Sequence, residues 1–297
     1  MAQARPIPLV YNPASGGGRG RVRFRKAEAV LAVAGLELDP IETTHPLHAT
    51  ELGLALANDG HDLILGFGGD GTLSELANGV LASGKKPTLG FLPSGTGNDF
   101  LRHFGVTDLD EAIKRIRAGK TLDLDAVRMR FDGRETWSIN LCGSGFAPKA
   151  VIAANKRYKW AGPQAYNLGV VDQIMRIGPE ETRLTMDGDT IEGAFPLILA
   201  CTTTYTGGAM KMAPDADPQD GLVDVMWVDR IGKLELLKLL GGIRKATHVG
   251  HPKVHFRQAA KVRIEPAEPS PLLGDGEVYG QTPVDLDVVP GALRVLL

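Results

Sequence analysis

One turn constrains the fold of this 297-residue chain more than any other segment: the glycine-rich stretch at residues 66–72, Gly-Phe-Gly-Gly-Asp-Gly-Thr. It follows the apolar run 62–65 and precedes the segment 73–80, an order that predicts a strand, a turn and a helix. Amides at the start of such a helix have no partners within the helix, and the helix dipole favours an anion there. The turn therefore predicts a phosphate site, and Asp70 beside it indicates that a metal ion or a proton is handled there.

Two other phosphate-binding motifs fit this segment poorly. Gly66, Gly68 and Gly71 satisfy the dinucleotide fingerprint, but the next predicted strand, residues 88–92, ends in Pro-Ser-Gly without the acidic residue that binds a ribose. The only Gly-Lys-Thr of the chain has Lys114 where a P-loop would begin with glycine. A turn without a ligand is the remaining alternative, although three glycines and an aspartate exceed what a simple connection needs.

Composition indicates a soluble globular protein long enough for two domains, with 43% hydrophobic and 23% charged residues. The net charge of -2 gives no overall field for nucleic acid, so we expect no nucleic-acid partner. Cys142 and Cys201 are the only cysteines, which excludes a disulfide framework and fits a reducing compartment. No segment has the pattern of a signal peptide or a membrane span, so we expect a cytoplasmic location.

Strands and helices alternate through residues 1–121, which predicts a parallel sheet with helices on both faces. The predicted helices are residues 21–34, 48–58, 73–80 and 109–118, the last with a capping box formed by Asp108 and Glu111.

Two further glycine-rich loops, residues 12–20 and 93–100, also follow predicted strands. Ligands of such sheets bind outside the carboxyl ends of the strands, so all three loops can converge on one polyphosphate. Thr72 and Thr96 would then supply hydroxyl donors. The alternative is that the two additional loops are ordinary strand-to-helix connections.

Strand-like segments dominate from residue 122 to residue 283, which predicts a second, mainly β domain. Asp187-Gly188 predicts a hairpin turn. Only residues 165–176 and 233–240 have a helical pattern, and the chain ends in two short strands separated by a turn at Pro290-Gly291. The predicted strands of this domain are residues 122–130, 137–141, 183–186, 191–203, 222–228, 253–256 and 261–265.

Two acidic segments lie in the second domain. Residues 213–224 carry four aspartates between prolines and glycines, a density of oxygen ligands that suits Mg²⁺, although a solvated acidic turn is an equal alternative. Asp275 and Glu277 flank a glycine and would face the same side of an extended segment. Beside a phosphate, one of these two carboxylates could accept the proton of an attacking hydroxyl.

Together these motifs resemble the bacterial diacylglycerol kinase-like lipid kinases, relatives of the sphingosine and ceramide kinases. The resemblance covers nearly the whole chain and implies an N-terminal NAD kinase-like α/β nucleotide-binding domain, residues 1–121, and a C-terminal β-sandwich lipid-binding domain, residues 122–283. The final segment, residues 284–297, would return to the first domain, and ATP would lie between the domains. The motifs are Asn12-Pro-Ala-Ser-Gly, Gly68-Gly-Asp-Gly-Thr, Pro93-Ser-Gly-Thr-Gly-Asn-Asp-Phe, Ala213-Pro with Asp220-Gly, and Asp275-Gly-Glu.

The resemblance also implies roles for single residues. Glu277 matches the general base, with Asp275 in the same motif, while Asp70 either positions the metal–nucleotide complex or is itself the base. A structural Mg²⁺ would bind the Asp220 carboxylate and the carbonyls of Asp217 and Leu222. Position 74 is serine where many relatives carry asparagine, which weakens that one contact. The implied nucleotide-binding residues are Asn12, Thr43, Gly68, Gly69, Asp70, Gly71, Thr72, Leu73, Ser74, Gly95, Thr96 and Asn98.

The implied activity is transfer of the ATP γ-phosphate to a lipid hydroxyl with Mg²⁺, in phospholipid biosynthesis. Diacylglycerol, a sphingoid base, ceramide and phosphatidylglycerol all remain open as the acceptor, and so does a homodimer. Residues 156–160 mix cations with aromatic side chains and, like the leucine-rich segment 233–245, could contact an anionic membrane surface.

Two other functions are alternatives: a soluble kinase of the NAD kinase type, which the two acidic motifs disfavour, and a non-catalytic lipid-binding regulator. A zinc site at His248, His251 and His255 is disfavoured because Pro252 interrupts the segment and no acidic or thiol ligand is near in sequence.

Overall fold

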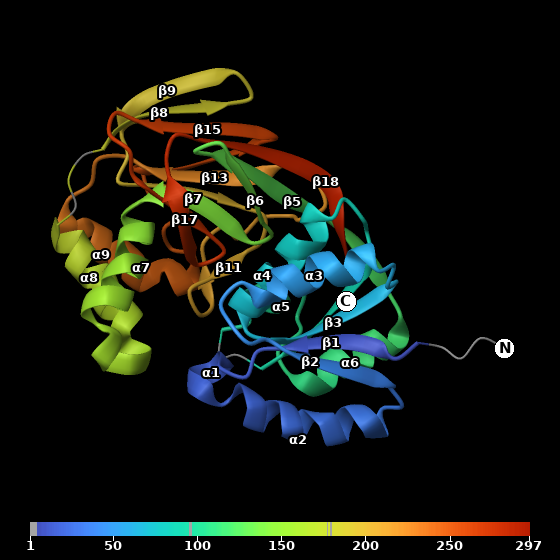
Figure 1. Cartoon of the computed structure of the whole chain (residues 1–297). Helices are drawn as coiled ribbons and strands as arrows, with labels where there is room; N and C mark the ends of the chain where they lie inside the picture. The colour runs from blue at the N-terminus through green and yellow to red at the C-terminus, as the bar shows by residue number, and fades with distance from the viewer. Residues whose placement is uncertain (1–4, 95–96, 177, 179) are drawn as a thin grey trace. The chain divides into compact units, whose positions relative to one another are not determined.

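The computed structural model describes residues 5–94, 97–176, 178 and 180–297 (Figure 1). The chain forms two compact units. Unit 1 comprises Met1–Leu124 and Gly291–Leu297, and unit 2 comprises Asp125–Pro290. The chain therefore passes from one unit to the other twice.

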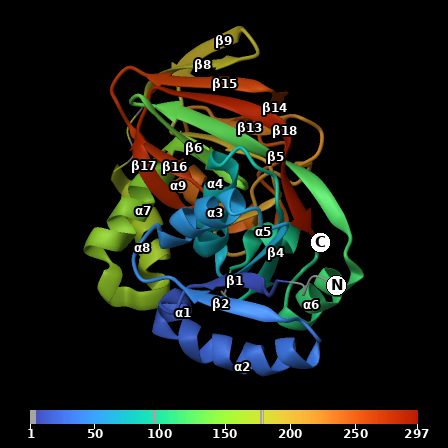
Figure 2. The ribbon, with the colours of Figure 1, turned by 45° about the vertical axis from the view of Figure 1, so that its right-hand side comes forward.

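Unit 1 is built on a parallel sheet in the order β2-β1-β3-β4-β18. Its central strands are almost free of polar side chains because both of their faces are covered, and Leu9, Ile64 and Leu89 are fully buried. Figures 1 and 2 show α2 on one face of this sheet and α3 and α4 on the other. The strands are β1 (Ile7–Tyr11), β2 (Leu38–Glu42), β3 (Leu63–Gly68), β4 (Thr88–Pro93) and the end of β18 (Val284–Leu296). The helices are α1 (Ser15–Gly18), α2 (Gly20–Val33), α3 (His48–Asn58), α4 (Asp70–Ala82), α5 (Asp99–His103) and α6 (Leu109–Ala118).

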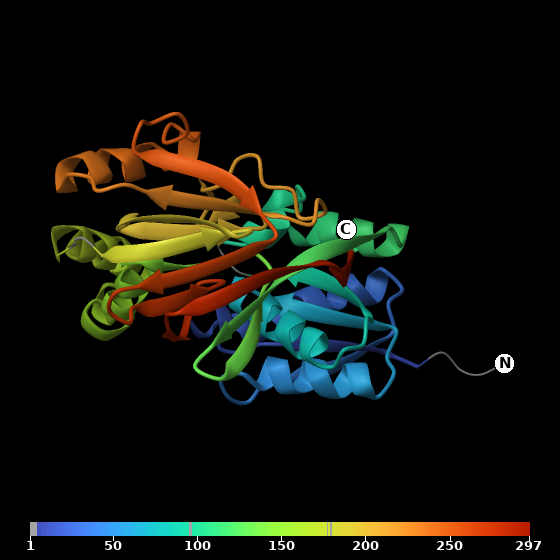
Figure 3. The same ribbon diagram turned by 90° about the horizontal axis from the view of Figure 1, so that it is seen from above.

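Most local predictions for unit 1 are confirmed. The helix at residues 48–58 has the predicted bounds, and the Asp108 side chain accepts the Glu111 amide at 2.9 Å as the N-cap of α6. The predicted turn at Pro290-Gly291 is wrong, because β18 is one continuous strand (Figure 3). Pro290 lies between the part of β18 that pairs with β15 and the part that pairs with β4, so its missing N–H interrupts neither ladder.

Unit 2 is a β-sandwich. One sheet contains β5, β6, β8, β9, β15 and the start of β18, and the other has the order β14-β13-β10-β7-β16-β17. Side chains from both sheets, such as Leu184, Val225 and Ile264, form one buried core. The remaining strands are β5 (Thr121–Phe131), β6 (Arg134–Ser138), β7 (Leu141–Gly145), β8 (Glu181–Met186), β9 (Asp189–Ala194), β10 (Leu197–Cys201), β11 (Tyr205–Thr206), β12 (Met210–Lys211), β13 (Val223–Val228), β14 (Val254–Ala259), β15 (Lys261–Pro266), β16 (Pro271–Gly274) and β17 (Glu277–Gln281).

Helices pack on the second sheet and form another core with it, which includes Phe146, Ile174 and Leu236. These helices are α7 (Phe146–Arg157), α8 (Ala165–Arg176) and α9 (Lys233–Gly242), with short 3₁₀ turns η1 (Lys159–Gln164) and η2 (Ile243–Lys245).

Three predictions for unit 2 are wrong. Helix α7 is missing from the prediction because its buried positions are mostly alanines, which give a weak periodic pattern, and because Pro148 falls in its first turn, where helices tolerate proline. The single strand predicted at residues 137–141 is interrupted between β6 and β7. The strand predicted at 191–203 is also two strands, β9 and β10, separated at Phe195-Pro196.

Candidate active site

The turn between β3 and α4 has the strand, turn and helix order predicted for it. A Cβ atom on Gly68 would lie 2.5 Å from the Cβ of Thr72, so glycine is needed for the turn to close. A Cβ atom on Gly71 would instead meet nothing within 4 Å. Gly71 thus leaves open space beside the first amides of α4, the position where a helix favours a phosphate. Leu73 and Ser74 follow in the first turns of α4 and are buried.

The Asp70 side chain contacts the glycine-rich loop at residues 93–100. Its Oδ1 atom accepts the Phe100 amide at 3.3 Å, and a Cβ atom on Gly97 would lie only 2.9 Å from its Oδ2 atom. The Ser94 amide, at the start of this loop, also donates to the Gly68 carbonyl at 2.8 Å. The loops after β3 and β4 are therefore linked, and Asp70 has a positioning contact in that link. Asn98, in the left-handed conformation with φ 49°, is the N-cap residue of α5. Gly95 and Thr96 lie outside the described residues.

The glycine-rich loop at residues 12–20 is connected to the same edge of the sheet through Arg23 of the helix that follows it. Arg23 donates a hydrogen bond to the Ser94 carbonyl. Asn12 closes the start of this loop, because its Oδ1 atom accepts the Ala14 amide at 2.9 Å. Arg23 is not among the residues predicted for the site, because it lies eleven residues after Asn12 within an ordinary basic segment of a helix. Thr43 comes directly after β2, is buried, and donates its amide to the Tyr11 carbonyl at 2.9 Å.

Asp275 lies in the turn between β16 and β17 and is bound on both carboxylate oxygens. It accepts the Ser138 hydroxyl at 2.7 Å and the backbone amides of Ile139, Asn140 and Leu141 at 2.9–3.1 Å. These donors form the interruption between β6 and β7, so Asp275 satisfies the amides that the break in the strand exposes. Its φ is 48° and that of Gly276 is 93°. The predicted extended segment with both acidic side chains on one side is therefore wrong.

Glu277 begins β17 and has a different environment. Its side chain is exposed, and no described residue forms a hydrogen bond or an ion pair with it. Surrounding protein nevertheless removes part of its hydration, and this desolvation raises the pKa of the Glu277 carboxyl above its ordinary value. A carboxylate with a raised pKa and no partner has the properties of a general base.

The acidic loop between β12 and β13 is folded by its own aspartates. Asp220 accepts the Leu222 amide and the Gln258 side chain, both at 2.9 Å, and Asp217 accepts the Gln219 amide at 3.0 Å. Burial, followed by the charges of neighbouring aspartates, raises the pKa of Asp224. The loop therefore concentrates negative charge in unit 2. Asp125, which is not among the predicted site residues, accepts the Gly221 amide of this loop at 2.7 Å.

The three histidines at positions 248, 251 and 255 have separate partners. His248 is buried, with Nε2 at 2.9 Å from the Met212 carbonyl, while His251 and His255 face Glu235 and Asp229. Among the described residues, these three histidines therefore have different neighbours.

Comparison with known proteins covers both units. Residues 6–129 match the model of the diacylglycerol kinase catalytic domain, and residues 140–297 match the YegS C-terminal NAD kinase beta sandwich-like domain. The diacylglycerol kinase of Bacillus subtilis (strain 168) is 29% identical over 286 residues, 95% of this chain and 92% of the relative. The diacylglycerol kinase of Staphylococcus carnosus (strain TM300) is 29% identical over 279 residues, 93% and 90% of the two chains.

Solved structures agree with this result. A crystal structure of a candidate diacylglycerol kinase from Bacillus anthracis str. Sterne is similar with a TM-score of 0.82 at 25% identity, covering 100% of this chain and 97% of the other. An NAD kinase from Archaeoglobus fulgidus, in complex with ATP, has a TM-score of 0.51 at 12% identity, covers 98% and 93% of the two chains, and shares the fold. The chain therefore belongs to the diacylglycerol kinase-like family of lipid kinases, phosphotransferases with an alcohol group as acceptor.

Proposed function

We propose that this protein transfers the γ-phosphate of ATP to the hydroxyl of a lipid, with Glu277 as the general base. The contrast between the two carboxylates of one turn carries this proposal: Asp275 is bound by four donors, whereas Glu277 has no described partner and a raised pKa. Only the second carboxylate is suited to taking up a proton.

In this reaction the lipid oxygen attacks the γ-phosphorus as the bond to the β-phosphate oxygen breaks, and ADP leaves. The hydroxyl proton passes to Glu277. The amides at the start of α4, beside the open space at Gly71, bind the phosphates and stabilise the charge that develops on them. Asp70 acts in positioning, through its hydrogen bond to the Phe100 amide, rather than as the base. Asn12, Thr43 and Asn98 complete the proposed nucleotide contacts.

The oxygen donors of the acidic loop fit Mg²⁺, which prefers carboxylate and carbonyl ligands. Burial raises the pKa of Asp224 most, and the charges of Asp220, Asp215 and Asp217 raise it further, so several carboxylates of this loop lie close to one another. The Asp220 carboxylate and the carbonyls of Asp217 and Leu222 would hold the ion. Mg²⁺ bound with ATP supplies positive charge to the phosphates.

A lipid acceptor requires contact with a membrane surface. No helix among the described residues has the length and hydropathy to span a bilayer. Apolar side chains are nonetheless exposed on unit 2: Trp160 is 80% exposed, Met175 in α8 60% and Leu234 in α9 77%. The Lys233 side chain donates to the Met175 carbonyl and so connects α8 with α9. We infer that these residues, with the exposed Lys156 and Arg157 near Trp160 in sequence, form a peripheral membrane contact.

The test is transfer of labelled γ-phosphate from MgATP to diacylglycerol, sphingosine, ceramide or phosphatidylglycerol in anionic vesicles, and to NAD in solution. Glu277→Ala should retain ATP binding and lose turnover by ~10² to 10⁴. Glu268→Ala is the matched control, since it removes an exposed glutamate of the same unit outside the proposed site. Sedimentation of the protein with the vesicles measures the membrane contact in the same samples.

Label on one of the lipids, lost in Glu277→Ala and kept in Glu268→Ala, would support the activity and the base together. Normal turnover of Glu277→Ala would exclude Glu277 as the base but leave the kinase activity standing. Label on NAD alone would replace the lipid kinase with a soluble small-molecule kinase.

A further inference from the structure

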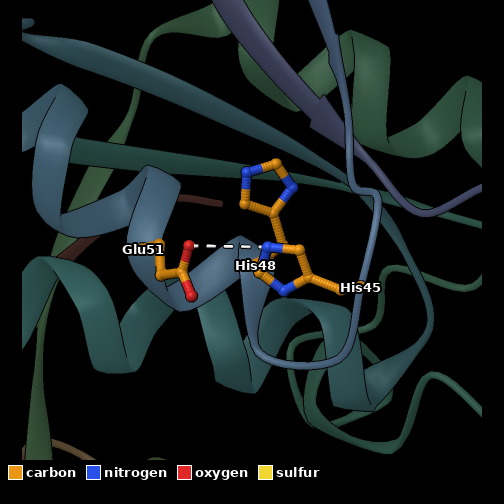
Figure 4. A group of neighbouring side chains, drawn as sticks. All are labelled: His45, His48 and Glu51. Atoms are coloured by element: carbon orange, nitrogen blue, oxygen red, sulfur yellow. Dashed lines mark ion pairs between the residues drawn. The ribbon is translucent and has the colours of Figure 1, made fainter.

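His45, His48 and Glu51 form a cluster at the start of α3 (Figure 4). Each of the three side chains offers one ligand atom, and these atoms all lie within 4.8 Å of one another. His45 and Glu51 are exposed and His48 is partly exposed, so the cluster is accessible from solvent. None of the three residues is part of the nucleotide or lipid site proposed above.

The chain geometry brings these side chains together. His48 and Glu51 are three residues apart in the first turn of α3 and therefore lie on the same helix face. His45 precedes the helix, and its ring stacks on that of His48 with the centroids 4.5 Å apart. The Nε2 atom of His45 lies 3.6 Å from Oε2 of Glu51.

Each imidazole has a partner for its Nδ1 atom. Nδ1 of His45 lies 3.0 Å from the Pro46 carbonyl, which can only accept, so Nδ1 carries the proton and Nε2 presents its lone pair toward Glu51. Nδ1 of His48 accepts the Thr44 amide at 3.0 Å and lies 3.3 Å from Oγ1 of the same residue. The His45 contact is of the kind that orients a metal-binding histidine and leaves its other ring nitrogen for the ion. The contacts with Thr44 fix the position of the His48 ring.

We propose that His45, His48 and Glu51 bind a transition-metal ion of the Zn²⁺ class. Two imidazoles and one carboxylate suit Zn²⁺, whereas Mg²⁺ and Ca²⁺ prefer oxygen ligands alone. Donor atoms in a tetrahedral zinc site are ~3.3 Å apart, given bonds of about 2.0 to 2.1 Å. The side chains therefore need to close by about 1.5 Å at most, which their exposure allows, and water completes the coordination. Binding would join the loop that follows Thr43 to α3.

The experiment uses the full chain after removal of metal with a chelator. Zn²⁺ is titrated by calorimetry, and Co²⁺ is used as a spectroscopic probe of tetrahedral coordination. The variants are His45→Ala and Glu51→Gln, with His61→Ala as the matched control, a histidine of the same unit outside the cluster. Circular dichroism and thermal unfolding without metal establish that each variant is folded.

We expect one Zn²⁺ per chain, a tetrahedral Co²⁺ spectrum and a Zn²⁺-dependent rise in Tm. His45→Ala should abolish all three, Glu51→Gln should weaken the affinity at least about tenfold, a loss of ~1.4 kcal/mol, and His61→Ala should change nothing. Zn²⁺ binding that is unchanged in His45→Ala, or no binding to the original protein, would overturn the proposal. None of these three readouts depends on kinase activity.

Discussion

The β3–α4 turn of unit 1 and the β16–β17 turn of unit 2 each contain an aspartate that binds backbone amides. The two turns differ in the groups that they leave for a ligand. In each turn one aspartate binds the backbone of a distant segment: Asp70 the loop after β4, and Asp275 the break between β6 and β7. The unit 1 turn then leaves open space at Gly71 beside helix amides, whereas the unit 2 turn leaves a carboxylate, Glu277. The hydrogen-bond partners of an acidic residue in a motif thus decide whether it stabilises the fold or is available for chemistry.

The largest effect is expected from Asp275→Ala, compared with Glu277→Ala. Removing Asp275 leaves three amides and a hydroxyl without their acceptor, and hydrogen bonds to a charged group contribute about 1.5 to 3 kcal/mol each. We expect the free energy of unfolding of Asp275→Ala to fall by at least ~3 kcal/mol, together with loss of activity. Glu277→Ala should lose activity with unfolding nearly unchanged. Urea denaturation of both variants makes the comparison, and equal stabilities would contradict a structural role for Asp275.

Two glycines of the unit 1 turn should respond in opposite directions to the same added methyl group. Gly68→Ala forces a Cβ atom against the buried Thr72 and should destabilise by about 1 to 3 kcal/mol. Gly71→Ala places its methyl group in open space within a helix, where alanine is favoured over glycine by up to ~1 kcal/mol. Its Tm should rise, while the KM for ATP should increase by roughly tenfold because the methyl group occupies the phosphate position.

Thermal unfolding of Gly68→Ala and Gly71→Ala measures the two opposite changes in stability, and ATP kinetics measure the change in KM. Gly71→Ala with an unchanged KM would mean that the open space beside α4 does not receive the nucleotide. Gly68→Ala with wild-type stability would show that the turn can relax around Thr72.

The smallest effect concerns pH. Glu277 must be ionised to accept a proton, so kcat/KM should fall as the pH falls through its pKa. Desolvation raises the pKa of Glu277, so this acid limb should lie above the range of an ordinary glutamate. For stability the sign is opposite: a raised folded-state pKa contributes stability at low pH that is lost as the pH rises through that pKa. The pH–rate profile tests the position of the acid limb. The free energy of unfolding of wild type relative to Glu277→Gln, measured over the same pH range, tests the change in stability. An acid limb at ordinary glutamate pH would contradict the raised pKa.

The parts of this structure that the sequence predicts are those set by local pattern. The β–α alternation of unit 1, the Asp108 cap and the Asp187-Gly188 hairpin each depend on neighbouring residues. The role of Asp275 was not predictable in this way, because its donors are 134 to 137 positions earlier in the chain. Arg23 was missed for the same reason, since its partner, the Ser94 carbonyl, is 71 residues away. Helix α7 was not predicted for another reason: alanine differs little in hydrophobicity from its neighbours, so the periodic pattern is weak.

Strand β18 has a consequence for how the protein is made. Its residues Arg294–Leu296 pair in parallel with Thr88–Gly90 of β4, and Leu293, Val295 and Leu296 are buried. Domains fold as units while the ribosome is still synthesising the chain. Unit 1 must wait, because its sheet keeps β4 unpaired on one side until the whole of unit 2 has been synthesised. Until β18 pairs with it, the exposed edge of β4 is a site for aggregation that a chaperone would have to cover.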